Sequence, residues 1–443
     1  MKRKMYAELV EWKKKEGRKP LLLTGARQVG KTYLLKEFGR QEFQDVVYLN
    51  LDKEKERFEV VFSGSIAPRE IILRLETLVG RAIKPGETLI IFDEVQEIPR
   101  AITALKYFCE EAPEYHVAAS GSLLGVALHQ GTSFPVGKVD QMKLSPLDFE
   151  EYMEAMGEGR LLEAVSDTAK LEILVDRFEK AFREYLLIGG MPEAVAKWVE
   201  SRDYAEVDRV QGEILLAYRD DVSKHVDATT AMRILQIWDS LPAQFAKRNE
   251  KFMFNVVREG ARAREYELAV QWLVDCELVR KVERVKVGDK VPLKFYVDSA
   301  AFKLYFLDVG LFRHLAGVTT DMVLSDTAMF DEFNGFFVEQ FVLQQMANRH
   351  KMYYWSSEAN AEVDFVAEFC GRVVPIEVKS GTNVKAKSLK TFREKYQSEL
   401  AVRFSLRLPE YNDRLLSLPI YLAGLTDGVI ESRLKGGIAE RMI

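Results

Sequence analysis

Cysteine is scarce in this chain, and long hydrophobic runs are absent. The three cysteines, Cys109, Cys276 and Cys370, are widely separated and form no Cys-x-x-Cys pair, which argues against a disulfide framework and against a zinc site of that spacing. No stretch approaches the ~18 uninterrupted apolar residues of a transmembrane helix. The basic N-terminal residues are followed by glutamates, where a signal peptide has its apolar segment. We therefore expect a cytoplasmic protein with no membrane partner.

The chain also lacks an excess of positive charge. Its net charge is −5, so nucleic-acid binding cannot be inferred from the overall charge. One segment differs, because residues 379–407 contain eight Lys or Arg and only two Glu. Such a segment is typical either of a solvated helix face or of a surface that meets a polyanion.

The length and the hydrophobic pattern indicate several domains. The 443 residues, of which 47% are hydrophobic, suffice for roughly three domains of about 150 residues each. In the first part, short apolar runs at 20–24, 46–51, 88–92 and 116–119 alternate with amphipathic segments. This alternation predicts an α/β fold in which helices cover a parallel sheet.

A glycine-rich segment follows the first apolar run. Residues 25–32 read Gly-Ala-Arg-Gln-Val-Gly-Lys-Thr and match GxxxxGK[ST] between a strand and a helix. In that context backbone N–H groups and the helix N-terminus can hold phosphates. Lys31 would bridge the β- and γ-phosphates of ATP, and Thr32 would bind Mg²⁺. The expected ATP-binding residues are Gly25, Ala26, Arg27, Gln28, Val29, Gly30, Lys31, Thr32 and Tyr33.

A second acidic signature follows the apolar run Leu89–Phe92. Asp93, at the carboxyl end of this strand, can hold the Mg²⁺ directly or through water, and Glu94 can orient and deprotonate the attacking water. A later strand ends at Ser120, whose hydroxyl either contacts the γ-phosphate or the attacking water, or belongs to an ordinary turn. This layout resembles the AAA-type ATPases, in which Ser120 would take the place of the first sensor.

The middle of the chain has a helical pattern. We interpret residues 149–228 as a helical lid that is interrupted at Gly189-Gly190, which are either a hinge or an ordinary helix stop. Residues 229–320 contain two helical patterns followed by extended runs at 279–287 and 291–297. Helices followed by a hairpin suggest a winged-helix-like domain.

Near the C-terminus, two extended runs flank Cys370-Gly371. A two-residue turn there pairs residues whose numbers sum to 741. This register places Asp364 opposite Glu377 and Glu362 opposite Lys379, with all four side chains on one face of the hairpin.

These acidic residues predict a metal site. Two carboxylates that face each other at ~5 Å repel unless a cation lies between them, so Asp364 and Glu377 would bind Mg²⁺, with Glu339 from a preceding helix as a third ligand. Lys379 would position a water or stabilise charge that develops on a phosphate. Asp…Glu-x-Lys with an upstream helical Glu resembles the PD-(D/E)XK nuclease superfamily, which implies Mg²⁺-dependent DNA cleavage. The alternative is a salt-bridged polar sheet face, with Glu362–Lys379 and Glu377–Lys379 pairs and without catalysis.

The motifs as a set resemble one family. The strings Gly-Ala-Arg-Gln-Val-Gly-Lys-Thr, Phe-Asp-Glu-Val-Gln, Gly-Gly-Met-Pro-Glu and Trp-Ser-Ser-Glu-Ala-Asn-Ala-Glu-Val-Asp-Phe resemble bacterial and archaeal AAA-type ATP-binding proteins with a C-terminal nuclease-like domain of unknown function. The resemblance implies a P-loop ATPase domain at 1–148 and a restriction-endonuclease-like α/β domain at 321–443. One departure is Gly137-Lys138, where Gly-Arg is expected, because lysine cannot replace the fork of an arginine finger. Arg100, Arg160 and Arg219 remain candidates, among which the sequence does not choose.

Two functions fit these features. In the first, an AAA-type ATPase controls a C-terminal half that binds nucleic acid, expected to be DNA, and cleaves it with Mg²⁺. In the second, the protein is a nucleotide-dependent switch whose nuclease-like domain binds a partner without cutting it. A protein partner or a homo-oligomer is compatible with either function.

Overall fold

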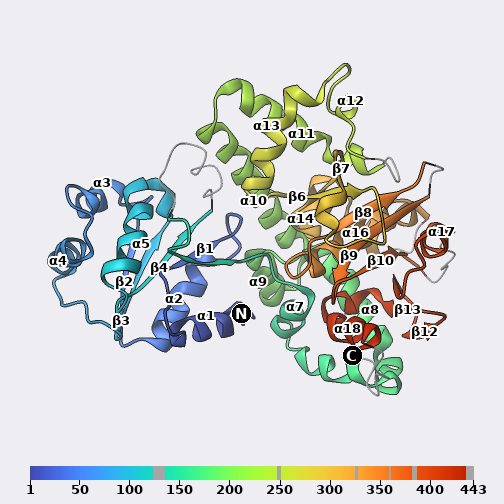
Figure 1. The fold of residues 1–443 in the computed structure, drawn as a ribbon, viewed down its shortest axis with the longest axis horizontal. Helices are drawn as coiled ribbons and strands as arrows, with labels where there is room; N and C mark the ends of the chain where they lie inside the picture. Colours follow the sequence, from blue (N-terminus) through green and yellow to red (C-terminus); the bar gives the residue numbers. More distant parts are fainter. Residues whose placement is uncertain (123–134, 247–250, 325–327, 359–360, 382–386, 436–443) are drawn as a thin grey trace. The chain divides into compact units, whose positions relative to one another are not determined.

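The computed structural model describes two compact units (Figure 1). Residues 2–145 and 271–278 form the N-terminal unit, and residues 146–270 and 279–443, with Met1, form the C-terminal unit. None of the helices in the part described is long and apolar enough to span a membrane. The residues described are 1–122, 135–246, 251–324, 328–358, 361–381 and 387–435.

The N-terminal unit is built on a five-stranded parallel sheet with the order β2-β3-β4-β1-β5. The four strands expected from the apolar runs are present, whereas the polar β5 is not indicated by the sequence pattern. β3 and β4 are buried along their whole length, as is usual for parallel strands that lie between layers of helices. The strands are β1 (Leu21–Thr24), β2 (Asp45–Asn50), β3 (Thr88–Asp93), β4 (His116–Gly121) and β5 (Asp140–Lys143).

Helices pack on this sheet through apolar side chains. Phe62 meets Phe92 of β3 edge to face at 5.3 Å between ring centroids, within a core that also contains Ile90, Leu105 and Val117. Burial of such side chains stabilises the unit by about 1.5–3 kcal/mol each. The helices are α1 (Met5–Lys14), α2 (Lys31–Glu42), α3 (Lys55–Glu59), α4 (Pro68–Val79) and α5 (Pro99–Glu111), with short 3₁₀ turns at Val60–Phe62 and Val95–Glu97.

The C-terminal unit begins with the helices that the sequence analysis assigned to a lid. They are α7 (Phe149–Ala155), a 3₁₀ segment at Gly159–Ser166, α8 (Thr168–Ile188), α9 (Pro192–Ser201) and α10 (Tyr204–His225). Next come α11 (Ala228–Ala246), α12 (Phe254–Val257), α13 (Ala263–Asp275), α14 (Val309–Leu315), α15 (Thr320–Leu324) and α16 (Ala328–Met346). The part of α13 from residue 271 onward is grouped with the N-terminal unit. The last are α17 (Lys387–Tyr396), a 3₁₀ segment at Ile420–Leu425 and α18 (Asp427–Leu434).

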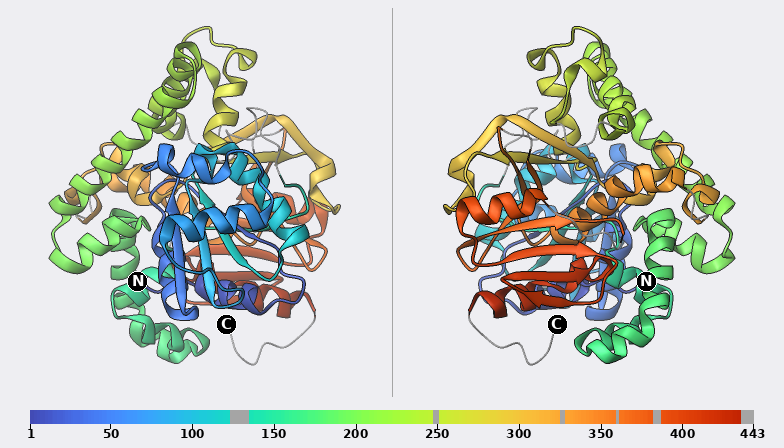
Figure 2. Two further views of the ribbon diagram at one scale, coloured as in Figure 1. Left: turned by 90° about the vertical axis from the view of Figure 1, so that its left-hand side faces the viewer. Right: turned by 90° about the vertical axis from the view of Figure 1, so that its right-hand side faces the viewer.

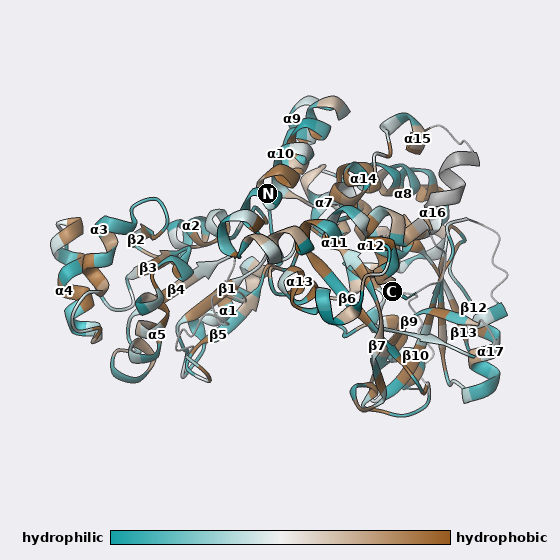
Figure 3. Cartoon of the chain, turned by 90° about the horizontal axis from the view of Figure 1, so that it is seen from above, coloured by the Kyte–Doolittle hydropathy of each residue, from teal (hydrophilic) through white to brown (hydrophobic). Residues whose placement is uncertain are grey.

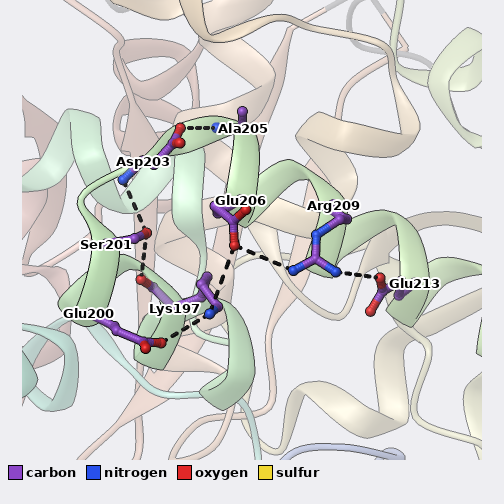
Figure 4. Close-up of polar contacts among 8 residues, drawn as sticks. All are labelled: Lys197, Glu200, Ser201, Asp203, Ala205, Glu206, Arg209 and Glu213. Atoms are coloured by element: carbon purple, nitrogen blue, oxygen red, sulfur yellow. Dashed lines mark hydrogen bonds and ion pairs between the residues drawn. The ribbon is translucent and has the colours of Figure 1, made fainter.

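The corner between α9 and α10 is fixed by local hydrogen bonds (Figure 4). The Ser201 hydroxyl donates to the Lys197 carbonyl at 3.0 Å and accepts from the Asp203 N–H at 3.2 Å. Asp203 caps α10 by accepting from the Ala205 N–H at 2.8 Å, which is worth about 1 kcal/mol. The surrounding exposed ion pairs contribute less than about 1 kcal/mol each; they are Lys197–Glu200, Lys197–Glu206, Arg209–Glu206 and Arg209–Glu213.

The Gly189-Gly190 break between α8 and α9 is tightly packed. Gly189 has a φ of 72°, and a Cβ on Gly190 would lie 2.0 Å from the Leu147 carbonyl oxygen. The Gly190 N–H donates to the buried carboxylate of Asp308 at 2.7 Å. The same carboxylate caps α14 by accepting from the Leu311 N–H at 3.0 Å. These contacts hold the turn in one conformation. They favour the interpretation of Gly189-Gly190 as a helix stop over that as a hinge.

The second part of this unit is a mixed eight-stranded sheet with the order β12-β13-β11-β10-β9-β8-β6-β7; Figure 2 shows it from two sides. β9 and β10 pair antiparallel, whereas β6–β8, β10–β11 and β11–β13 are parallel pairs. The strands are β6 (Val279–Val285), β7 (Val297–Phe306), β8 (Tyr353–Ser356), β9 (Glu362–Phe369), β10 (Arg372–Val378), β11 (Ala401–Ser405), β12 (Glu410–Asn412) and β13 (Leu415–Pro419).

One expected strand is misplaced. The run at 291–297 was expected to pair with 279–287, but β6 pairs with β7, which begins at Val297. Pro292 cannot donate a ladder hydrogen bond, and the Leu293 N–H donates to the Glu368 carboxylate at 2.6 Å instead. The hairpin belongs to the same sheet as β8 to β13, and the winged-helix-like domain at 229–320 remains a prediction.

Helix α16 is fixed to the sheet by glutamines one turn apart. Gln340 both accepts from the Phe306 N–H and donates to the Phe306 carbonyl, at 2.9 and 2.8 Å. Gln344 accepts from the Val309 N–H at 2.9 Å and donates to Asp308 at 3.0 Å. These bonds satisfy buried backbone groups at the end of β7 and fix the helix that carries Glu339.

The packing at Gly190 predicts a large effect of a single methyl group. Gly190→Ala should lower the free energy of unfolding of the C-terminal unit by roughly 3 kcal/mol, because the Cβ displaces the Leu147 backbone. Gly335→Ala in α16 is the matched control, since its Cβ meets no atom within 4 Å, and alanine in a helix should raise stability by up to about 1 kcal/mol. Urea unfolding of both variants decides this; equal effects would contradict it.

Candidate nucleotide site and acidic cluster

The loop between β1 and α2 has the backbone of a phosphate-binding turn. Gly25 has a φ of 148°, and a Cβ there would lie 2.2 Å from the Leu144 carbonyl oxygen. Gln28 also has a positive φ, of 66°. The loop therefore closes against the segment after β5, which only glycine permits at position 25.

Lys31, the first residue of α2, is buried and points back over the loop. Its Nζ donates to the carbonyl oxygens of Gly25 and Ala26, at 2.8 Å each. Burial lowers the pKa of Lys31 because desolvation disfavours the charged form. Carbonyl dipoles hold the ammonium group in this structure, and a phosphate would be a stronger partner for it. Tyr33, the last residue of the expected set, is 59% exposed.

The Asp93 carboxylate, at the end of β3, joins three other segments. It accepts from the Thr32 hydroxyl at 2.8 Å and from the Ser120 hydroxyl of β4 at 2.5 Å. The Tyr48 hydroxyl of β2 donates to it at 2.7 Å. Burial and the nearby Asp93 raise the pKa of Tyr48, so the phenol stays protonated and remains a donor. The structure thus brings together Thr32, Asp93 and Ser120.

Glu94 has a strained backbone with a φ of 52°. A non-glycine residue in this region costs about 1–3 kcal/mol and is enriched at functional sites. The carboxylate accepts from Gln96 Nε2 at 2.7 Å and from the Ser122 hydroxyl at 3.0 Å. Its direction is therefore fixed by two neighbours.

Sequence reasoning missed Tyr48, Gln96 and Ser122 as members of this site. Gln96 lies two residues after Glu94, and Ser122 lies two residues after Ser120. Their closeness in sequence to predicted site residues could have indicated both. Tyr48 could be found only from the strand order, because β2 has to lie beside β3. Of the candidate fingers, Arg100 donates to the Phe62 carbonyl at 2.7 Å and Arg219 forms an ion pair with Asp239.

In the C-terminal unit, the predicted hairpin is confirmed. β9 and β10 pair in the expected register, with Phe369 opposite Arg372 and Phe365 opposite Ile376. Cys370 and Gly371 have φ values of 49° and 72°, as a two-residue turn of the primed type requires. Continuing this register brings Asp364 opposite Glu377.

The ion pairs of this face differ in part from those expected. Glu362 pairs with Lys303 of β7, at 2.5 Å, and not with Lys379 across the hairpin. Lys379 instead pairs with Glu377, also at 2.5 Å. Lys303 comes from the edge of the sheet, 59 residues before Glu362, so the hairpin register alone could not reveal it.

The other two acids, Asp364 and Glu339, also have hydrogen-bond partners. The Asp364 carboxylate accepts from the Val378 N–H at 2.7 Å, and Glu339 of α16 accepts from the Tyr305 hydroxyl at 3.1 Å. We call Glu339, Glu362, Asp364 and Glu377, with Lys303 and Lys379, the acidic cluster.

The acidic cluster carries uncompensated negative charge. Four carboxylates face two ammonium groups, and the Arg403 guanidinium, opposite Glu377 in the β10–β11 register, reduces the excess negative charge of the ionised cluster to one. Burial, followed by the charge of Asp364, raises the pKa of both Glu339 and Glu377. Oε2 of Glu377 is buried and has no hydrogen-bond partner among the residues that the structure describes, which is costly for a carboxylate.

The cluster does not have the geometry of a formed metal site. Within the described ranges, no group of three or more His, Cys, Asp or Glu side chains is arranged to hold a metal ion. Glu339, Asp364 and Glu377 are neighbours, because the charge of Asp364 raises the pKa of the other two. Their oxygens nevertheless do not converge on one point while Lys379 binds Glu377.

Comparisons with known proteins identify the N-terminal part. Residues 17–153 match the model of an AAA domain, which supports an AAA-type ATPase in this part of the chain. Residues 179–322 and 334–421 match two domains of unknown function. No curated protein matches the chain.

Solved structures resemble the chain distantly. A Walker-type ATPase of Pyrococcus abyssi is 15% identical, with 71% of this chain and 95% of that chain covered and a TM-score of 0.44. The ORC1 protein of Aeropyrum pernix, solved in complex with DNA, is 14% identical over 71% and 90% of the two chains, with a TM-score of 0.30. The RuvB Holliday junction branch migration motor of Thermotoga maritima is 12% identical over 66% and 88%, with a TM-score of 0.28.

The hydrogen bonds of Glu94 predict that losing one of them slows ATP hydrolysis but leaves ATP binding nearly unchanged. Ser122→Ala removes one of its two hydrogen bonds and should lower kcat for ATP about tenfold, while KM changes less than about twofold. Thr103→Ala is the matched control, since within the described part of the chain its hydroxyl bonds the Pro99 carbonyl of α5 alone. Steady-state kinetics tests this, and an unchanged kcat in Ser122→Ala would contradict the role assigned to Ser122.

Proposed function

We propose that the protein binds and hydrolyses Mg²⁺–ATP at the end of the N-terminal sheet. The observation that carries this proposal is the hydroxyl–carboxylate pair of Thr32 and Asp93 beside the loop 25–31. The two oxygens lie 2.8 Å apart, and hydroxyl and carboxylate oxygens are the ligands that Mg²⁺ prefers. Loop backbone, helix N-terminus and Lys31 supply the positive field for the phosphates.

The residues then have separate tasks in hydrolysis. Lys31 would leave the carbonyls of Gly25 and Ala26 and bind the β- and γ-phosphates. Glu94, held by Gln96 and Ser122, would orient and deprotonate the attacking water. Ser120 would keep Asp93 in place through its hydrogen bond. Thr32 and Asp93 would hold Mg²⁺, which would supply charge stabilisation for the transferred phosphoryl group.

Two variants separate nucleotide binding from hydrolysis. Lys31→Ala should weaken ATP binding at least about tenfold because it removes the phosphate cation. Glu94→Gln should retain binding and lower kcat by about a hundredfold or more, because the amide cannot accept the proton. Calorimetric binding and phosphate release measure the two effects. Full hydrolysis in Glu94→Gln would contradict the assignment of the base.

A second proposed activity belongs to the acidic cluster, which we propose binds a divalent cation and cleaves nucleic acid. The observations that support it are the excess of carboxylates over cations and Oε2 of Glu377, which has no hydrogen-bond partner among the described residues. One divalent ion would neutralise that excess. Asp364 and Glu377 would hold it with Glu339, which requires Lys379 to turn from Glu377 towards the scissile phosphate. Lys303 would remain bound to Glu362.

The rival function is a nucleotide-dependent switch with a silent C-terminal domain. It is favoured by the two lysine–glutamate pairs, Lys303–Glu362 and Lys379–Glu377, and by the absence of a formed metal geometry among the described residues. In that case the acidic cluster is only a salt-bridged face of the sheet, and ATP turnover is independent of it.

Metal binding distinguishes these functions. Mn²⁺ at about ten times its Kd should stabilise the wild-type protein by about 1.4 kcal/mol, seen as a rise in melting temperature, and Asp364→Asn should lose the rise. Glu368→Gln on the same strand is the matched control, because its amide oxygen can still accept from the Leu293 N–H.

Cleavage is assayed with linear, single-stranded and branched DNA in the presence of Mg²⁺ or Mn²⁺. The nuclease proposal expects cleavage by the wild-type protein that is lost in Asp364→Asn. No cleavage, or cleavage unaltered by Asp364→Asn, would remove the nuclease function and leave the switch.

A further inference from the structure

The C-terminal unit exposes a basic surface that two distant segments build together. We define it as the loop 286–296, between β6 and β7, and helix α17. Gly288 of the loop lies so close to α17 that a Cβ there would meet the rings of Phe392 and Tyr396 at 2.2 and 2.9 Å. Leu293 of the loop and Leu389 of α17 also belong to one buried apolar cluster. The two segments are therefore packed on each other.

This surface has a strong positive charge. The two segments carry seven Lys or Arg and two acidic residues. The exposed lysines are Lys286, Lys290, Lys294, Lys387, Lys390 and Lys395. Figure 3 draws α17 largely in the hydrophilic colour. The neighbouring Lys385, part of the basic segment noted in the sequence, lies outside the described residues.

Few of these charges are neutralised within the protein. Lys390 forms an ion pair with Glu394 at 3.7 Å, whereas in the described part of the chain Lys286, Lys294 and Lys387 form no ion pair. A solvated helix face usually alternates charges of both signs. The excess on two packed segments therefore favours an anionic partner.

The same surface presents an aromatic ring to solvent. Phe295 is 82% exposed, although it stands between the buried Leu293 and the β7 strand. The turn that carries it is rigid, since the Lys286 N–H donates to the Tyr296 carbonyl at 2.9 Å and the Phe295 N–H donates to the Pro292 carbonyl at 3.2 Å. An exposed ring on such a hydrogen-bonded turn, among lysines, can stack on a base while the lysines meet phosphates.

We propose that the basic surface binds single-stranded nucleic acid, with the lysines on the phosphates and Phe295 stacked on an unpaired base. An unpaired base is required because the rings of a duplex are already stacked on each other. This inference rests on the proposal that the C-terminal unit binds nucleic acid, and it names both the binding surface and the strand form. DNA and RNA share the chemistry, so the experiment separates them.

The test measures binding of the full-length protein to fluorescent oligonucleotides by anisotropy. The probes are oligo-dT and oligo-U of about 20 nucleotides and a DNA duplex of equal length. Wild-type protein should bind single strands at least about tenfold more tightly than the duplex. The salt dependence is measured between about 50 and 200 mM. Preference for oligo-dT or oligo-U identifies the natural polymer.

Two variants address the two contacts. Lys286→Ala/Lys294→Ala should weaken binding about tenfold and reduce the salt slope by roughly 1.4, because two phosphate contacts are lost. Phe295→Leu keeps an apolar side chain but removes stacking, and should weaken binding about fivefold or more. Lys106→Ala/Lys224→Ala, which removes two exposed lysines on other helices, is the control and should bind as the wild type does.

The outcomes separate this inference from the function it rests on. If the wild-type protein binds no nucleic acid, the nucleic-acid proposal fails and the inference fails with it. If the wild type binds but both variants behave like the control, the inference is overturned while nucleic-acid binding stands. Equal binding of duplex and single strands, with no effect of Phe295→Leu, overturns the stacking role. Thermal unfolding of each variant shows that a loss of binding does not come from unfolding.

Discussion

The hydrogen bonds of the Asp93 carboxylate are the interaction on which the nucleotide site depends. Asp93 ends a strand that is buried throughout, so its charge needs partners. Those partners are hydroxyl groups from α2, β2 and β4. They can meet Asp93 only because β3 lies between β2 and β4, and β4 lies beside β1, which leads into the loop and α2. The strand order and the burial of the sheet therefore determine the geometry of the site.

In the acidic cluster, by contrast, the carboxylates outnumber the cationic groups that face them. At Asp93 one carboxylate has three neutral donors, whereas the cluster concentrates four carboxylates around two lysines, with Arg403 opposite Glu377. Such an excess is tolerated only if protons or cations are bound, and burial and like charge raise the pKa of Glu339 and Glu377 accordingly. The fold supports this arrangement, because the hairpin turn sets Asp364 opposite Glu377 and the glutamines of α16 fix the helix of Glu339. A purely structural sheet face would be more stable with fewer acids.

The sequence predicted those features that depend on local rules. The loop 25–32, the strand that ends at Asp93 and the register across Cys370-Gly371 all follow from short-range patterns, and the structure contains them. Tyr48 escaped prediction because its strand lies beside that of Asp93 only in the folded sheet. Lys303 escaped it because it reaches Glu362 from the edge strand β7, which no local pattern places near β9. The error at 291–297 has a local cause: an apolar run was taken for a strand although Pro292 interrupts its hydrogen bonding. The apolar side chains of this run have the propensity of a strand, but Pro292 has no N–H to donate to a neighbouring strand. The backbone hydrogen bonding therefore determined the structure there.

The most direct test of the account is a crystal structure with a non-hydrolysable ATP analogue and Mn²⁺, measured at the manganese absorption edge. The account predicts an anomalous peak next to Thr32 and Asp93, with Lys31 Nζ moved from the carbonyls of Gly25 and Ala26 to the phosphates. A nucleotide bound elsewhere, or Lys31 still bonded to those carbonyls with no manganese at Asp93, would contradict it.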